Sequence, residues 1–159
     1  MTVLCCGLSE AAALATRLGD EAMHHHMQAF LARVQTTVER YGGSMVQYGV
    51  DGCMALFGAP RAHEDHARRA VLAALALQQA LPEPQHAEHL SISIGVHTGP
   101  VVVGSLGHEA PRLYTAMGET IQLATSLQRA AAAGDVLMSS ATYQLVQEEV
   151  RGELWEAGT

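Results

Sequence analysis

An Asp-Gly pair inside an apolar stretch constrains the fold of this chain more than any other feature. The pair is Asp51-Gly52, and apolar, β-prone residues flank it over residues 48–60. Asp-Gly between apolar runs is a strong signal for a β-hairpin, because both residues tolerate the positive φ angles of a tight turn. The pattern therefore predicts hairpin arms at residues 44–49 and 53–58. It places the Asp51 carboxylate at the tip, where it either caps its own turn or holds a metal ion.

Hydrophobic periodicity predicts alternating strands and helices along the rest of the chain. Apolar or alternating runs predict strands at residues 2–6, 90–97, 101–104, 112–117 and 136–138. Capping signals and a spacing of three to four residues predict helices from Asp20 or Gly19 to Gly42-Gly43, and at residues 64–81, 118–131 and 141–146, with a further helical start at Ser9. Because the hairpins are antiparallel, the predicted class is α+β rather than a doubly wound parallel sheet.

Two of these helices have a recognisable core-facing side. In the long helix it consists of Met23, Met27, Phe30, Leu31, Val34 and Val38. In the helix at residues 64–81 it is expected to consist of Val71, Leu72, Leu75 and Leu77. We therefore expect both helices to pack against the sheet.

Length, charge and cysteine usage narrow the classes of protein to which the chain can belong. Its 159 residues suit a single domain with a sizeable core. A formal net charge of −7 argues against a nucleic-acid-binding protein, which would present a basic surface. No apolar run reaches the ~18 residues of a membrane-spanning helix, so we expect no membrane segment. Three cysteines, two of them adjacent, suit reduced core residues of a cytoplasmic protein rather than a disulfide framework.

One pair of histidines admits both a structural and a metal-binding interpretation, and a further histidine only a structural one. His63 and His66 have the spacing of a weak zinc pair, but the acids between them also suit the first turn of a helix, where they favour the helix dipole. His97 precedes a Thr-Gly-Pro turn, and we expect it to be a structural residue at a strand end.

Four longer motifs occur in an order that resembles one known family. They are Met-Ala-Leu-Phe-Gly-Ala-Pro at 54–60, Ala-His-Glu-Asp-His-Ala at 62–67, Ile-Gly-Val-His-Thr-Gly-Pro-Val at 94–101 and Tyr-Thr-Ala-Met-Gly-Glu-Thr at 114–120. With the Asp-Gly hairpin they resemble the catalytic domain of class III adenylate and guanylate cyclases, especially its bacterial branch similar to soluble cyclases. The resemblance covers nearly the whole chain. It implies a ferredoxin-like fold, with a mostly antiparallel central sheet flanked by helices.

The resemblance also implies a demanding chemistry. Such cyclases form a homodimer, or a heterodimer with another cyclase homology domain, and their nucleotide sites lie at the interface. The ribose 3′-hydroxyl of ATP or GTP attacks the α-phosphate and pyrophosphate leaves. Two metal ions activate the hydroxyl and hold the phosphates, so two carboxylates must lie close together. In addition, a cation stabilises the transition state, an amide positions the ribose, and a pair of polar side chains binds the base.

The metal positions of the family are only half retained. The second metal aspartate falls on Asp51, but the first falls on Gly7, which offers no carboxylate. One carboxylate could hold Mg²⁺ or Mn²⁺ weakly, but not two ions a few ångströms apart. We therefore expect that no cofactor is required.

The nucleotide positions of the family are altered as well. The base-reading lysine falls on Gln47 and its polar partner on Leu113, which cannot hydrogen-bond a purine. The ribose asparagine falls on Gln122, which is one methylene longer. The transition-state arginine falls on Ser126, and a neutral hydroxyl cannot replace a guanidinium.

These substitutions predict an intact cyclase scaffold with a degenerate cyclising site. The expected function is a dimerisation or regulatory module in intracellular signalling. Two alternatives stay open, namely a sensor that binds ATP or GTP through Asp51 and Gln122, and an active cyclase that makes cAMP or cGMP with a partner domain. Residues 1–159 are expected to be one cyclase homology domain of a longer multidomain signalling protein, without the last strand of the family.

Overall fold

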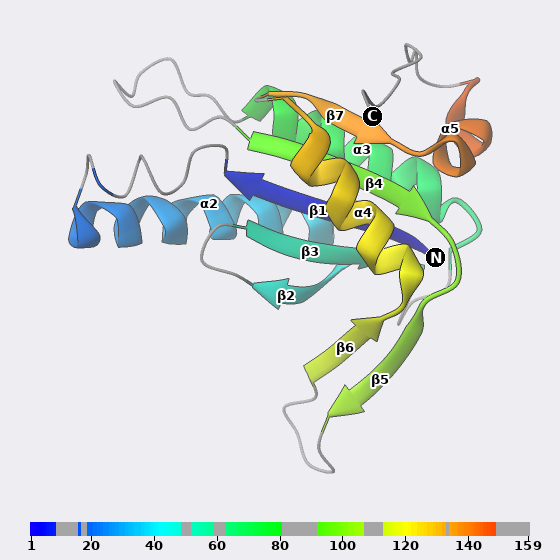
Figure 1. Ribbon diagram of the computed structural model, residues 1–159, viewed down its shortest axis with the longest axis horizontal. Coiled ribbons are helices and arrows are strands. Elements are labelled where there is room, and N and C mark those ends of the chain that lie inside the picture. The colour runs from blue at the N-terminus through cyan, green and yellow to red at the C-terminus, as the bar shows by residue number, and fades with distance from the viewer. Residues whose placement is uncertain are drawn as a thin grey trace.

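A computed structural model describes residues 1–8, 16, 19–48, 52–58, 63–80, 92–106, 113–132 and 134–148 of the protein (Figure 1). The helical start expected at Ser9 and the turn that contains Asp51 lie outside these residues. The strands are β1 (Thr2–Leu8), β2 (Ser44–Tyr48), β3 (Gly52–Phe57), β4 (Ile92–Thr98), β5 (Val102–Leu106), β6 (Leu113–Met117) and β7 (Val136–Met138). The helices are α2 (Asp20–Arg40), α3 (His66–Ala80), α4 (Glu119–Ala130) and α5 (Ser140–Val146).

The central sheet has five strands in the order β2-β3-β1-β4-β7. Neighbouring strands are antiparallel except for β4 and β7, which are parallel. From β1 to β4 the chain follows the strand–helix–strand–strand–helix–strand order of a ferredoxin-like fold, and these four strands have that fold's spatial order. The predicted α+β class and the mostly antiparallel sheet are therefore confirmed.

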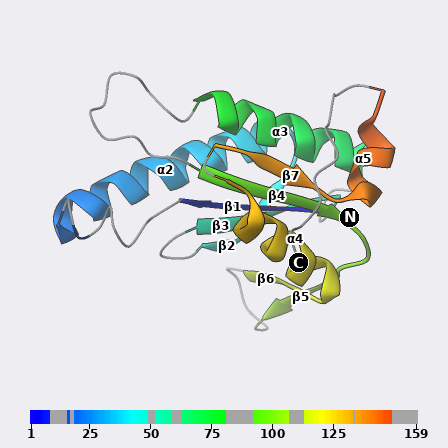
Figure 2. The ribbon, with the colours of Figure 1, turned by 45° about the horizontal axis from the view of Figure 1, so that its top comes forward.

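Helices cover both faces of the sheet. Helices α2 and α3 lie on one face and α4 lies on the other, as Figure 2 shows most clearly. Strands β5 and β6 form a separate antiparallel hairpin that projects beyond the sheet and lies next to β2 (Figure 1). None of the helices described is long and apolar enough to cross a lipid bilayer.

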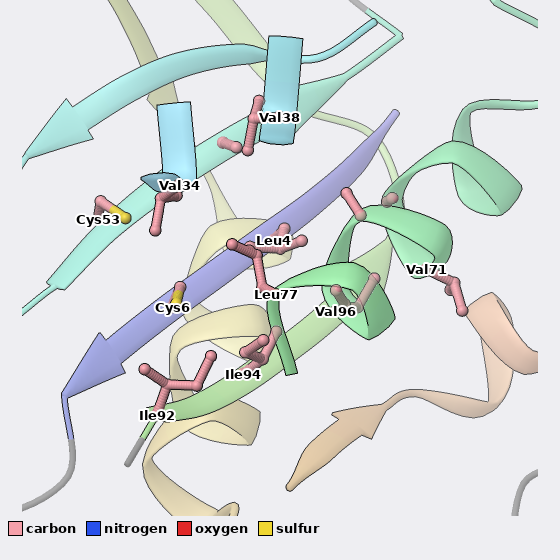
Figure 3. Packing of buried hydrophobic residues seen from close by; sticks show 14 of the residues in the cluster. Leu4, Cys6, Val34, Val38, Cys53, Val71, Leu77, Ile92, Ile94 and Val96 are labelled. Atoms are coloured by element: carbon pink, nitrogen blue, oxygen red, sulfur yellow. The ribbon is translucent and has the colours of Figure 1, made fainter. Parts of the chain in front are cut away.

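Alternating side chains along β1 divide the core into two clusters. Leu4, Cys6 and Leu8 point toward α2 and α3, where they meet buried side chains of β3 and β4 (Figure 3). Val3 and Cys5 point to the opposite face and pack beneath α4. This alternation is the ordinary geometry of a strand that is covered on both sides.

The long helix α2 packs as its sequence predicts, and two glycines follow its end. Its buried stripe consists of Met23, Met27, Phe30, Val34 and Val38, with Leu31 partly buried. The helix ends at Arg40, and Gly42, two residues further on, has a φ of 86°, a left-handed conformation that glycine adopts without strain. The next residue, Gly43, donates a backbone hydrogen bond of 2.9 Å to the Val38 carbonyl. A Cβ at Gly43 would lie 2.6 Å from the Phe57 ring, so this turn packs tightly against β3.

Helix α3 differs from its prediction in two ways. It begins at His66 rather than residue 64, because Glu64 and Asp65 form the turn that precedes it. Its buried side was predicted from leucines, but Leu72 and Leu75 are only half-buried. Small side chains allow the helix to approach the sheet closely, and the residues buried with Val71 and Leu77 are Ala67, Ala70, Ala73 and Ala74.

Candidate functional site

Gly7, which stands at the first metal-ligand position of the family, is paired with a second glycine. Gly7 of β1 lies directly opposite Gly52 of β3, the residue that follows Asp51. By strand alternation both belong to the face of the sheet that α4 covers further along. A Cβ at Gly52 would collide with the Cys6 carbonyl oxygen and lie 3.0 Å from the Gly7 Cα. The two backbones are therefore in close contact, and neither residue offers a side-chain oxygen to a cation.

The cysteine thiols of these two strands, on either face of the sheet, are also poor ligands. Cys6 lies opposite Cys53 in the register, and both are buried in the core beneath α2. The hydrogen bond with Cys53, together with burial, raises the pKa of the Cys6 thiol well above its usual value. Burial raises the pKa of the Cys5 thiol to about 11. Metal-binding thiols are deprotonated, whereas these stay neutral at physiological pH.

The described side chains do not fit a two-metal centre. In the described ranges, no group of three or more His, Cys, Asp or Glu residues could hold a metal ion. Asp51, the predicted ligand, lies outside those ranges. His66, one member of the predicted zinc pair, instead hydrogen-bonds through Nδ1 to the Thr2 hydroxyl at 2.8 Å. Two-metal chemistry needs paired anionic ligands, so no reaction step can be derived from these residues.

A β-bulge sets the direction of Gln47. The register between β2 and β3 shifts between Met45 and Gln47, and Gln47 then lies opposite Met54. Met54 belongs to the cluster on the α4 face, and Val46 packs against the same cluster. The extra residue therefore turns Gln47, which is exposed, toward the face shared by Gly7. The sequence alone does not predict this bulge, because Val46 and Gln47 have the pattern of ordinary alternating strand residues.

Helix α4 carries the other two predicted site residues. Gln122 and Ser126 are one helical turn apart and both are exposed. The opposite side of the helix is fixed to the sheet, where Gln128 donates a 2.9 Å hydrogen bond to Ser93 and the Thr120 hydroxyl donates one of 2.6 Å to the Pro100 carbonyl. Gln122 and Ser126 are thus held on a rigid helix with their side chains turned toward solvent.

Leu113, the remaining predicted site residue, is the first residue of β6 and pairs with Leu106 of β5. Met117, at the other end of β6, is the residue that leads toward α4, so Leu113 stands at the end of this strand that is remote from the start of the helix. No hydrogen bond among the described residues joins Gln47, Gln122 or Ser126 to one another. The predicted base, ribose and phosphate positions are thus carried by three different elements, β2, β6 and α4.

Comparison with known proteins agrees with this architecture. The family model for the adenylate and guanylate cyclase catalytic domain matches residues 1–156. The chain belongs to this family. Adenylate cyclase 1 of Rhizobium meliloti is 35% identical to this cyclase domain over 97 residues, which cover 57% of the chain and 15% of that enzyme. Soluble guanylate cyclase gcy-32 of Caenorhabditis elegans is 24% identical over 99% of the chain and 23% of its own length. The cyclase domain thus spans less than a quarter of these relatives.

Solved cyclase structures share its fold. The adenylyl cyclase CyaB from P. aeruginosa aligns with a TM-score of 0.82 at 27% identity, over 94% of this chain and 81% of its own. The guanylate cyclase domain of RhGC from Catenaria anguillulae, solved in complex with GTP, aligns with a TM-score of 0.84 at 26% identity, over 92% of this chain and 81% of its own. The scaffold of this cyclase domain is therefore that of the family.

Proposed function

We propose that this cyclase domain does not cyclise nucleotides and serves as a dimerisation or regulatory module in bacterial intracellular signalling. The observation that carries the proposal is the Gly7–Gly52 pair, where the backbones meet and no side-chain oxygen is present. The family's chemistry calls for a carboxylate at position 7. Without it, a second metal ion has no anionic ligand beside Asp51.

The exposed side of α4 supports the same conclusion. Ser126 stands where the family supplies a transition-state cation, and the exposed Arg129 lies nearly one turn further along α4 rather than at that position. In related phosphoryl-transfer chemistry an arginine of this kind contributes ~10³–10⁵ in rate. A serine hydroxyl carries no charge and hydrogen-bonds a phosphate less strongly. The loss at position 126 therefore adds to the loss at position 7.

We also propose that the domain works with a second cyclase homology domain as part of a longer protein. Support comes from the exposure of Gln47, Gln122 and Ser126, since the family resemblance implies that these positions face a nucleotide site at a dimer interface. The matching relatives are several times longer than the chain, which agrees with a module of a larger protein.

A metal-binding comparison tests the proposal at its decisive position. The protein should bind no more than one Mn²⁺ per chain by calorimetry, and Gly7→Asp should add a second binding event. Gly7→Asn is the matched control, because it has nearly the same volume but no charge, and it should add none. Two Mn²⁺ ions bound by the unchanged protein at the hairpin would contradict the proposal.

A second candidate is a sensor that binds a nucleotide without turnover. It rests on the bulge that turns Gln47 toward the site face and on the exposed Gln122 amide. Submillimolar binding of ATP or GTP, weakened by Asp51→Ala, would favour this function. The absence of any heat of binding would remove it.

A further inference from the structure

A continuous chain of side-chain hydrogen bonds runs across one end of the sheet, where β1 begins and β4 ends. Both ends of the chain are imidazoles and the four inner members are hydroxyls. The successive contacts are His66 Nδ1 to Thr2 Oγ1 at 2.8 Å, Thr2 to Thr98 Oγ1 at 2.9 Å, Thr98 to Thr142 Oγ1 at 2.9 Å, Thr142 to Ser139 Oγ at 3.2 Å and Ser139 to His97 Nδ1 at 2.7 Å.

The hydrogen-bonded chain connects the two faces of the sheet, and two of its four hydroxyls are fully buried. Thr2 and Thr142 are fully buried, at 0% exposure, so no bulk water competes for their hydroxyls. His66 is the first residue of α3, on one face of the sheet. His97 lies opposite Val3, on the face that α4 covers. The two imidazoles are each partly exposed, so both can exchange protons with solvent.

The two imidazoles are not independent, because the hydrogen-bonded groups between them hold a limited number of protons. Five hydrogen bonds join the six groups, and the four hydroxyls supply four protons. The fifth proton must come from an imidazole, so one Nδ1 donates while the other accepts. We propose that His66 and His97 share a single Nδ1 proton through this hydroxyl chain, so that the tautomer and charge of one imidazole determine those of the other.

Protonation of both imidazoles disturbs the row of hydrogen bonds between them. Each imidazolium then donates from Nδ1, and one hydroxyl proton loses its place in the chain. Its best alternative acceptor is the Val96 carbonyl, which Thr142 Oγ1 reaches only at 3.5 Å, a weak hydrogen bond. The first proton therefore binds to a fully hydrogen-bonded chain and the second to a strained one. The two histidines should titrate with negative coupling.

The charged groups around each end act on the same equilibrium. At His66 the N-terminal ammonium of Met1 opposes protonation and Asp65 favours it, but burial dominates and the pKa of His66 is lowered from 6.5. At His97 burial also lowers the pKa, while Glu119, the first residue of α4, opposes that shift. From α5 and its N-cap, the groups that reach the hydrogen-bonded chain are the neutral hydroxyls of Thr142 and Ser139. Protonation near α3 is thus communicated to the start of α4, the helix that carries Gln122 and Ser126.

Histidine-selective ¹⁵N NMR of the whole chain tests the proposal. At high pH one of the two imidazoles should be the Nδ1–H tautomer and the other the Nε2–H tautomer. On acidification, both should follow the same two steps, separated by about one pKa unit. His66→Ala should turn the His97 titration into a single step.

Two substitutions at the middle of the chain distinguish the relay from packing. Thr98→Val keeps the side-chain shape but removes the hydroxyl, so it should uncouple the two titrations. Thr98→Ser keeps the hydroxyl and should preserve the two steps, and His24→Ala on the exposed face of α2 should change neither histidine. If His97 titrates in a single step that His66→Ala leaves unchanged, the proposal is wrong, whether or not Thr98→Val folds. These readouts do not depend on any nucleotide chemistry.

Discussion

At the scale of single residues, glycines allow neighbouring backbone segments to approach one another closely. Gly95 of β4 lies beneath α4, and a Cβ there would collide with the Ala124 carbonyl oxygen and the Gln128 backbone nitrogen. These are helix backbone atoms, which cannot move aside as the end of a flexible side chain can. Gly52 has the same relation to the β1 backbone. Glycine at both places is a requirement of packing rather than of flexibility.

Gly95→Ala should therefore destabilise the protein severely. Overpacking against backbone costs about 1–3 kcal/mol or more of unfolding free energy, which urea unfolding can measure. Gly19→Ala is the control, because open space surrounds Gly19 and only its φ of 86° opposes a side chain, at a cost of about 1 kcal/mol. A smaller loss for Gly95→Ala than for Gly19→Ala would contradict the close approach of α4.

The buried thiols predict how stability depends on pH. The pKa of Cys5 is about 11 in the folded protein, against 9.0 when exposed, so the folded state keeps a proton that the unfolded state loses. The unfolding free energy should therefore fall as the pH rises from about 9 toward about 11. Urea unfolding across that range measures the slope, and Cys5→Ala should make it shallower. A slope unchanged by Cys5→Ala would show that this thiol is not desolvated.

At the scale of elements, apolar periodicity predicted every described strand and helix but not how each one packs. The buried stripe of α2 was correct because large apolar residues recur along one side of the helix. In α3 the same pattern predicted that Leu72 and Leu75 would be buried, yet most of the buried side is formed by alanines, whose small size gives a weak periodic signal. The bulge at Val46 was also missed, because register depends on the partner strand.

Substitutions in α3 should separate buried from half-buried leucines. Leu77 has 0% exposure, so Leu77→Ala should lower the unfolding free energy by about 2–5 kcal/mol, by loss of burial and creation of a cavity. Leu72→Ala should cost less, and Leu145→Ala, at 61% exposure, should cost least. Equal losses at positions 77 and 72, measured by chemical unfolding, would contradict the packing of α3.

At the scale of the whole molecule, the sequence specifies the scaffold more directly than the site. The sheet order, the helices on both faces and the projecting hairpin are those of the cyclase family, and the motifs at residues 54–60 and 94–101 were enough to indicate them. The site residues could be assigned only by resemblance. Their arrangement in space depends on how α4, β2 and the β5–β6 hairpin are placed, which no local sequence pattern specifies.

The most direct test of the central claim is an assay for cyclic nucleotide. Purified protein incubated with ATP or GTP and Mn²⁺ should form no cAMP or cGMP above a protein-free blank, since Gly7 and Ser126 leave the site without a metal carboxylate and a cation. Asp51→Ala serves as the control for any trace activity. Product that accumulates with the unchanged protein and disappears with Asp51→Ala would contradict the account.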